Sequence, residues 1–184
     1  MPTHVALLRG INVGGHNRVA MADLRTVVAG RGHRDVSTYI ASGNVVFTSD
    51  SADDADALAD ELEQAIADEL AVTPAVVVLT RDELAAIVAA NPYPDVVDGR
   101  HVHAVFHRQA EEPDAAVVAE AEVRARTEGS GDSATVVGRT VYLHTPDGLG
   151  RSRLAELLNR GDAVAAGTTR NWRTVTRLVA MVGD

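Results

Sequence analysis

The sequence predicts an α+β fold, an α/β sandwich made of two tandem ferredoxin-like subdomains sharing a core. Three observations predict it. The first half of the chain reads as strand, helix, two strands, helix and strand; the second half echoes that order; and each half has a short glycine turn between two strand-like runs. We expect an N-terminal subdomain over 1–94 and a C-terminal one over 95–184, with a linker at 95–100 and an extra helix at the C-terminal end.

In the first half, the spacing of the apolar residues sets the elements. Residues 4–8 form an apolar run that is too continuous to alternate, which predicts a buried strand. Helical spacing predicts two helices, and a capping box from Thr80 to Glu83 starts a third. The expected order is strand 4–8, helix 21–32, strands 36–41 and 45–49 about Ser42-Gly43-Asn44, helix 53–70, strand 75–79 and the capped helix, which ends before Pro92.

The second half repeats these signals. The expected order is strand 102–108, helix 113–126, a glycine-rich loop at 128–132, strands 134–137 and 140–144 about Gly138-Arg139, helix 154–160 and a last helix over about 171–181. Three histidines, His101, His103 and His107, alternate on one face of the first of these strands. A His-x-His pair can bind zinc, but the sequence suggests no third ligand. We therefore expect no metal site and attribute the pattern to a half-exposed strand.

Composition and charge exclude several classes of function. The chain has no cysteine, so disulfides and thiolate nucleophiles are excluded, and its apolar N-terminal run is too short for a signal peptide or a membrane span. We expect a cytoplasmic protein with no cofactor. The net charge of −9 argues against a generic nucleic-acid binder, yet it is unevenly spread: residues 1–40 and 148–184 each carry +3, and the middle carries −15. The two ends are therefore candidates for one basic surface.

The first candidate binding segment is the loop after strand 4–8. It contains Arg9 and Gly10, and the further candidate residues in it are Asn12, Gly14, Gly15 and Asn17. Glycines allow backbone N–H groups to converge on an anion, and an arginine can pair with it. The alternative is a tight turn with Arg9 in a salt bridge. In the next turn, Ser42 and Asn44 either add polar groups beside Arg9 or simply form a hairpin.

Two further candidates lie near the C-terminus. Arg151 and Ser152 stand in a second glycine-rich loop at the start of a helix, where they either contact an anion or cap the helix. In the hexapeptide at 168–173, a threonine caps the last helix, which places Arg170 and Asn171 in its first turn. An arginine there opposes the helix dipole, so we expect Arg170 to face a negative group. Trp172 is either a core anchor or a platform for a base.

Five segments together resemble the bacterial domain-of-unknown-function family 1697. They are LLRGINVGGHN (7–17), MADLR (21–25), TYIASGNVVF (38–47), YLHTPDG (142–148) and TRNWRTV (169–175). The resemblance spans essentially the whole chain and implies a small cytoplasmic protein with two ferredoxin-like units, without an established activity. One departure is Arg153 after Ser152, where the family usually has lysine, so a role that needs a deprotonated amine would be lost.

These observations lead to three hypotheses. The first is a small ligand with a phosphate or carboxylate group, such as a nucleotide, bound at the subdomain junction by Arg9 and Arg170, with hydrogen bonds from Asn12, Ser42, Asn44 and Asn171. The second is a nucleic-acid-binding module with Trp172 stacking on a base. In the third, the motifs are purely structural. The sequence nominates no nucleophile or general base for an enzyme, and it gives no indication of the oligomeric state.

Overall fold

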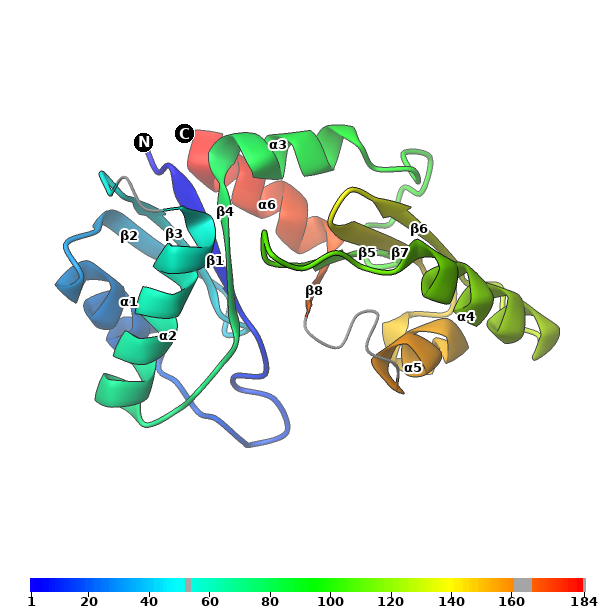
Figure 1. Ribbon diagram of the computed structural model, residues 1–184, viewed down its shortest axis with the longest axis horizontal. Helices are drawn as coiled ribbons and strands as arrows, with labels where there is room; N and C mark the ends of the chain where they lie inside the picture. Colours follow the sequence, from blue (N-terminus) through cyan, green and yellow to red (C-terminus); the bar gives the residue numbers. More distant parts are fainter. Residues whose placement is uncertain (52–53, 161–166, 184) are drawn as a thin grey trace. The chain divides into compact units, whose positions relative to one another are not determined.

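The computed structural model describes residues 1–51, 54–160 and 167–183, which form two four-stranded antiparallel sheets with their helices (Figure 1). The chain divides into two compact units, Met1–Ala86 with Arg177–Asp184, and Ile87–Thr176. The division falls within two helices, α3 (Arg81–Ala89) and α6 (Trp172–Gly183). The predicted α+β class with two subdomains is confirmed. The boundary at 94/95 and the shared core stay predictions.

The first unit has the ferredoxin-like order. Its elements are β1 (His4–Leu8), α1 (Met21–Gly30), β2 (Arg34–Tyr39), β3 (Asn44–Thr48), α2 (Ala55–Leu70) and β4 (Val76–Thr80). The strands run β2-β3-β1-β4, each antiparallel to its neighbours. The helices α1 and α2 lie side by side on one face of this sheet (Figure 1). Their apolar faces, with Leu24, Val28, Leu58 and Leu62, pack on sheet residues such as Phe47.

The second unit repeats the same topology. Its elements are β5 (Val102–Phe106), α4 (Ala115–Thr127), β6 (Ser133–Val137), β7 (Thr140–His144), the short 3-10 helix η1 (Leu149–Arg151), α5 (Arg153–Arg160) and β8 (Thr168–Asn171). The strand order is β6-β7-β5-β8. The core joins Val118 of α4 and Leu154 and Leu158 of α5 to Val105, Val141 and other sheet residues. The two halves are thus topological copies.

The strand β8 corrects one expectation. Residues 168–171 were expected to cap and begin the last helix, but they form an edge strand in which Arg170 is opposite Ala104 of β5. The helix α6 begins at Trp172, and the Oδ1 atom of Asn171 accepts a hydrogen bond of 2.9 Å from the N–H of Thr174. Four polar residues give no alternation of apolar side chains, so the strand left no signal. The argument that Arg170 opposes a helix dipole is therefore wrong.

The burial of the histidines in and beside β5 also differs from the prediction. Every residue of β5 is buried, and His103 and His107 are only 5% and 4% exposed, so a half-exposed strand does not explain them. Burial lowers the pKa of His103 to about 4. Within residues 1–51, 54–160 and 167–183, no three His, Asp or Glu side chains are grouped as a metal site. In the same ranges, no helix has the length and apolar character needed to span a membrane.

Candidate functional site

The loop after β1 is held in shape by Asn12. Its Nδ2 atom donates hydrogen bonds to the carbonyl oxygens of Val19 (2.9 Å) and Ala41 (2.8 Å), and its Oδ1 atom accepts from the N–H of Val19 (2.9 Å). The backbone of Asn12 has φ +54°, a left-handed conformation that asparagine tolerates better than most residues. Asn17 adds a hydrogen bond from Nδ2 to the carbonyl of Gly10 (3.1 Å). Both amides therefore support the loop.

The hairpin turn between β2 and β3 is equally structural. Asn44 is fully buried and donates to the carbonyl of Tyr39 (2.9 Å) and to Ser42 Oγ (3.0 Å). Gly43 has φ +79°, and a Cβ atom there would lie 2.8 Å from atoms of Ile11 and Leu8. The turn thus packs directly on the loop after β1. The turn brings Ser42 and Asn44 to that loop as parts of its support, and their predicted role beside Arg9 stays a prediction.

Exposed cations remain in this region. Arg9 is exposed, and its guanidinium has no hydrogen bond or ion pair with any residue that the structure describes; the same is true of Arg18. The alternative of a salt-bridged Arg9 is thus not observed. The glycines Gly14 and Gly15 both have positive φ and lie exposed between these two arginines. Two exposed cations thus lie in a loop that hydrogen bonds from Asn12 and Asn17 support.

The second glycine-rich loop places Ser152 as a helix cap. Ser152 Oγ donates to Asp132 Oδ2 (2.8 Å) and accepts from the N–H of Ala155 (2.9 Å) at the start of α5. Asp132, which had no distinguishing signal in the sequence, is 6% exposed and also accepts from Ser130 Oγ (2.6 Å). Arg151 is exposed, and no described residue pairs with it.

Arg170 is placed differently from its prediction. It lies in β8 and is 7% exposed, and its Nη1 atom donates to Thr168 Oγ1 (2.9 Å) and to the carbonyl of Thr169 (2.8 Å). Burial lowers its pKa to about 10, so it stays charged at neutral pH. Arg9 belongs to the first unit and Arg170 to the second. Their predicted convergence on one ligand stays a prediction.

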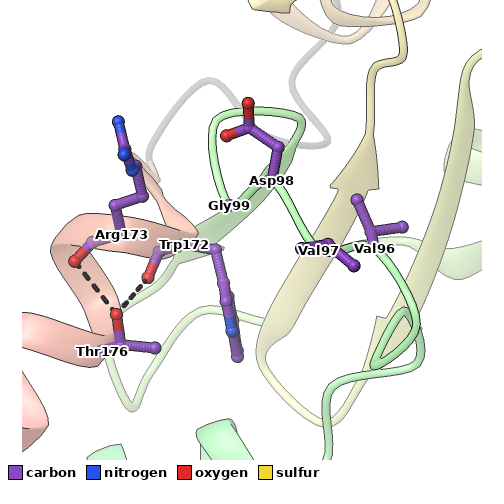
Figure 2. Close-up of a pocket in the computed structure, with 7 residues that line it drawn as sticks. All are labelled: Val96, Val97, Asp98, Gly99, Trp172, Arg173 and Thr176. Carbon is purple, nitrogen blue, oxygen red and sulfur yellow. Dashed lines mark hydrogen bonds between the residues drawn. The ribbon is translucent and has the colours of Figure 1, made fainter.

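A pocket of about 450 Å³ lies at the start of α6, within the second unit. Figure 2 shows the Trp172 side chain along one side, Val96 and Val97 across the opening from it, and the Arg173 side chain pointing the other way. The remaining lining residues are Asp98, Gly99 and Thr176. Of this set, sequence reasoning selected only Trp172. The segment 96–99 falls within the linker that the sequence predicts at 95–100.

The pocket wall is made by a close approach of two distant segments. The N–H of Trp172 donates to the carbonyl of Gly99 (3.0 Å). A Cβ atom on Gly99 would lie 3.1 Å from the backbone nitrogen and 3.0 Å from Cγ of Arg173, so only glycine fits without displacement. The Trp172 ring also lies near Tyr142, with ring centroids 6.2 Å apart. Trp172 is thus held by contacts with Gly99 and Tyr142 and remains half-exposed.

The charge balance at this pocket is positive. Arg100 donates hydrogen bonds from Nε and Nη2 to Asp98 (2.9 and 2.6 Å), and this pairing holds the pKa of Asp98 far below its usual range. The carboxylate is therefore ionised but already neutralised. Arg173 is exposed and makes no ion pair within the described part of the chain. One uncompensated positive charge remains on the wall, which favours an anionic ligand.

The lack of a hydrogen bond or ion pair with any described residue is shared by a wider group of exposed arginines. In the described ranges, five exposed arginines have side chains without any hydrogen bond or ion pair, and all lie in the two basic ends of the sequence: Arg9, Arg18, Arg151, Arg173 and Arg177. Arginines of the acidic middle, such as Arg100, Arg124 and Arg126, are paired with carboxylates. The positive charge of the two ends of the sequence thus includes guanidinium groups that no described carboxylate neutralises.

Comparison with known proteins gives a family and a fold. The family model described as "Protein of unknown function (DUF1697)" matches residues 1–142. The solved structure of conserved bacterial protein SP0830 from Streptococcus pneumoniae is similar, with a TM-score of 0.73 and 24% sequence identity, over 98% of this chain and 98% of that one. At this identity the similarity shows the fold alone. No curated protein matches the chain in sequence.

Proposed function

The chain belongs to the DUF1697 family, and we propose that it binds a small molecule that carries a flat ring and an anionic group, as a nucleotide does, in the pocket at the start of α6. Family membership brings no activity with it, so the proposal rests on chemistry. The observation that carries it is a half-exposed tryptophan in a pocket whose one unpaired charge is an arginine.

The ring of Trp172 supplies the apolar part of the recognition. A base stacked on an aromatic side chain gains about 1–3 kcal/mol. Val96 and Val97 offer aliphatic contacts across the opening. The pocket volume of about 450 Å³ falls within the range of about 300–1,000 Å³ that is usual for small-molecule sites.

Arg173 supplies the charged part. Its guanidinium can pair with a phosphate or carboxylate through two parallel hydrogen bonds. Because the Trp172 and Arg173 side chains point in different directions, the ligand has to reach both. This arrangement favours a molecule with its ring and its anionic group at opposite ends, and disfavours a bare anion such as inorganic phosphate.

Trp172 is the chain's single tryptophan, so its fluorescence reports on this pocket alone. We expect adenosine 5′-monophosphate (AMP) to quench it saturably, at lower concentrations than adenosine or inorganic phosphate. Arg173→Ala should weaken AMP binding about tenfold, the loss expected for one charge-assisted hydrogen-bonded contact. Arg177→Ala is the matched control, because Arg177 is an unpaired arginine of the same helix that does not line the pocket.

Two results would overturn the proposal. One is an unchanged Trp172 signal with all three probes. The other is equal weakening by Arg173→Ala and Arg177→Ala, which would indicate unspecific attraction to a basic surface. Trp172→Phe, followed by calorimetry instead of fluorescence, should retain part of the binding because phenylalanine still stacks.

A single-stranded nucleic acid is the second candidate, favoured by the five unpaired arginines of the two basic ends. It predicts that an oligonucleotide quenches Trp172 and that its affinity falls steeply with salt, since each phosphate contact releases counterions. Arg173→Ala and Arg177→Ala would then both reduce the slope of affinity against salt. No binding at low salt would eliminate this candidate.

A further inference from the structure

Ile40, the residue after β2, is strained and exposed at the same time. Its φ of +50° lies in the left-handed region, where a β-branched residue is rare, and 50% of the residue is exposed. The conformation costs about 1–2 kcal/mol for a residue with a Cβ atom. Burial does not explain the choice of isoleucine, because half of the side chain remains in water. Strain of this kind is often found at sites of contact with other molecules.

Ile40 belongs to a small surface that also exposes an aliphatic side chain and two cations. Val13 is 64% exposed and follows Asn12, whose amide donates to the carbonyl of Ala41, the residue after Ile40. The same amide binds the backbone of Val19, next to Arg18.

Arg9 joins this group from the end of β1. It follows Leu8, whose N–H donates to the carbonyl of Gly43 (2.8 Å) in the turn after Ile40. We call Arg9, Val13, Arg18 and Ile40 the loop surface. It consists of two exposed aliphatic side chains and two unpaired guanidinium groups, on a support fixed by hydrogen bonds.

A complementary site lies on the second unit. A notch of about 150 Å³ between α4 and α5 is lined by Val117, Glu120, Ala121, Arg124 and Leu157. Val117 is 41% exposed. Glu120 is exposed and pairs with no described residue, whereas Arg124 is neutralised by Glu128 (3.3 Å). The notch thus offers the aliphatic side chains of Val117, Ala121 and Leu157 together with the unpaired carboxylate of Glu120.

We propose that a second copy of this chain docks on the loop surface, with Ile40 seated in the α4–α5 notch of that copy and Arg18 paired with its Glu120. Apolar character and charge agree on both sides: exposed aliphatic side chains meet a lining with aliphatic side chains, and unpaired cations meet an unpaired anion. The occupant is a second copy because this chain itself provides the complementary notch.

A single contact between one loop surface and one notch is weak. Four side chains cover much less than the roughly 800 Å² per partner of a standard stable interface. Each copy carries one loop surface and one notch, so each copy can take part in two such contacts. We therefore expect association in the micromolar to millimolar range, weakened by salt.

Sedimentation velocity over a concentration series, at low and high salt, tests the proposal. We expect reversible association at low salt that Ile40→Asn weakens at least tenfold. Asparagine accepts a positive φ, so this variant removes the exposed isoleucine side chain without adding backbone strain. Val137→Thr is the control, because Val137 is another exposed aliphatic residue, at 41%, and it belongs to neither surface.

A charge exchange gives the sharpest result. Arg18→Glu alone and Glu120→Arg alone should each associate less than the wild type, and a mixture of the two variants should recover association. The mixture offers one native pair and one reversed pair, so recovery requires that these two positions meet between copies. A monomer under all conditions, an unchanged constant with Ile40→Asn, or a mixture no stronger than its components would overturn the proposal.

Discussion

Replacing Asn12 by glycine and by alanine separates the two roles of this residue, hydrogen bonding and backbone conformation. Glycine keeps the φ of +54° without strain but removes the three side-chain hydrogen bonds to Val19 and Ala41. At about 1 kcal/mol for each partly buried hydrogen bond, and less for the exposed one to Ala41, Asn12→Gly should lose about 2–3 kcal/mol of unfolding free energy. Asn12→Ala should lose about 1 kcal/mol more, because alanine resists positive φ.

The assay is urea and thermal unfolding of both variants beside Asn17→Gly. In a chain of this length, 1 kcal/mol corresponds to about 2–4 °C, so Asn12→Gly should melt about 4–12 °C below the wild type. Asn17 also has a positive φ, of +48°, but its side chain makes a single exposed hydrogen bond, so Asn17→Gly should lose less than about 1 kcal/mol. Equal stabilities of Asn12→Gly and Asn17→Gly would refute the supporting role of Asn12.

Three further predictions concern single residues. Gly43→Ala should lose about 2–4 kcal/mol of unfolding free energy, because the new methyl group meets Ile11 at 2.8 Å and φ is +79°. Gly30→Ala, with open space in α1, should be neutral or gain about 0.5 kcal/mol. Urea melts compare the two variants, and equal effects would contradict this prediction. Burial lowers the pKa of His103 from 6.5 to about 4, so the unfolded chain binds more protons between these values and stability should fall as the pH drops through them, by on the order of 3 kcal/mol from this residue. His103→Asn should reduce the pH slope of the unfolding free energy by about one proton, and an unchanged slope would argue against a neutral buried imidazole. Ile40→Asn should unfold within about 0.5 kcal/mol of the wild type, since relief of strain offsets lost contacts; a loss above about 1 kcal/mol would show that Ile40 serves the fold instead.

The fold was predictable where local signals and burial agree. The apolar run of β1, the glycine turn at Gly43 and the capping box at Thr80 each determine their structure locally; the hydroxyl of Thr80 indeed accepts from the N–H of Glu83 (3.1 Å). The strand β8 was missed because its pairing with β5 depends on residues more than sixty positions away. No local pattern in four polar residues reports such a pairing.

The candidate site was predictable only in part. Trp172 was selected for its rarity, and its exposure in a pocket agrees with the binding hypothesis. Arg173 was overlooked in favour of Arg170, although the two differ mainly in environment: Arg170 is buried in a strand edge, and Arg173 is exposed on a helix. Val96 and Gly99 carry no signal of their own, because their role arises from packing against a segment about seventy residues later.

The central claim is that the Trp172 pocket binds a ring and an anion together. Fluorine NMR of protein labelled with 5-fluorotryptophan tests it most directly, since Trp172 gives one resonance. We predict that AMP shifts this resonance saturably in the wild type and in Arg177→Ala, and that Arg173→Ala needs about tenfold more AMP for the same shift. A resonance that does not move at millimolar AMP, or that moves identically in all three proteins, would contradict the account.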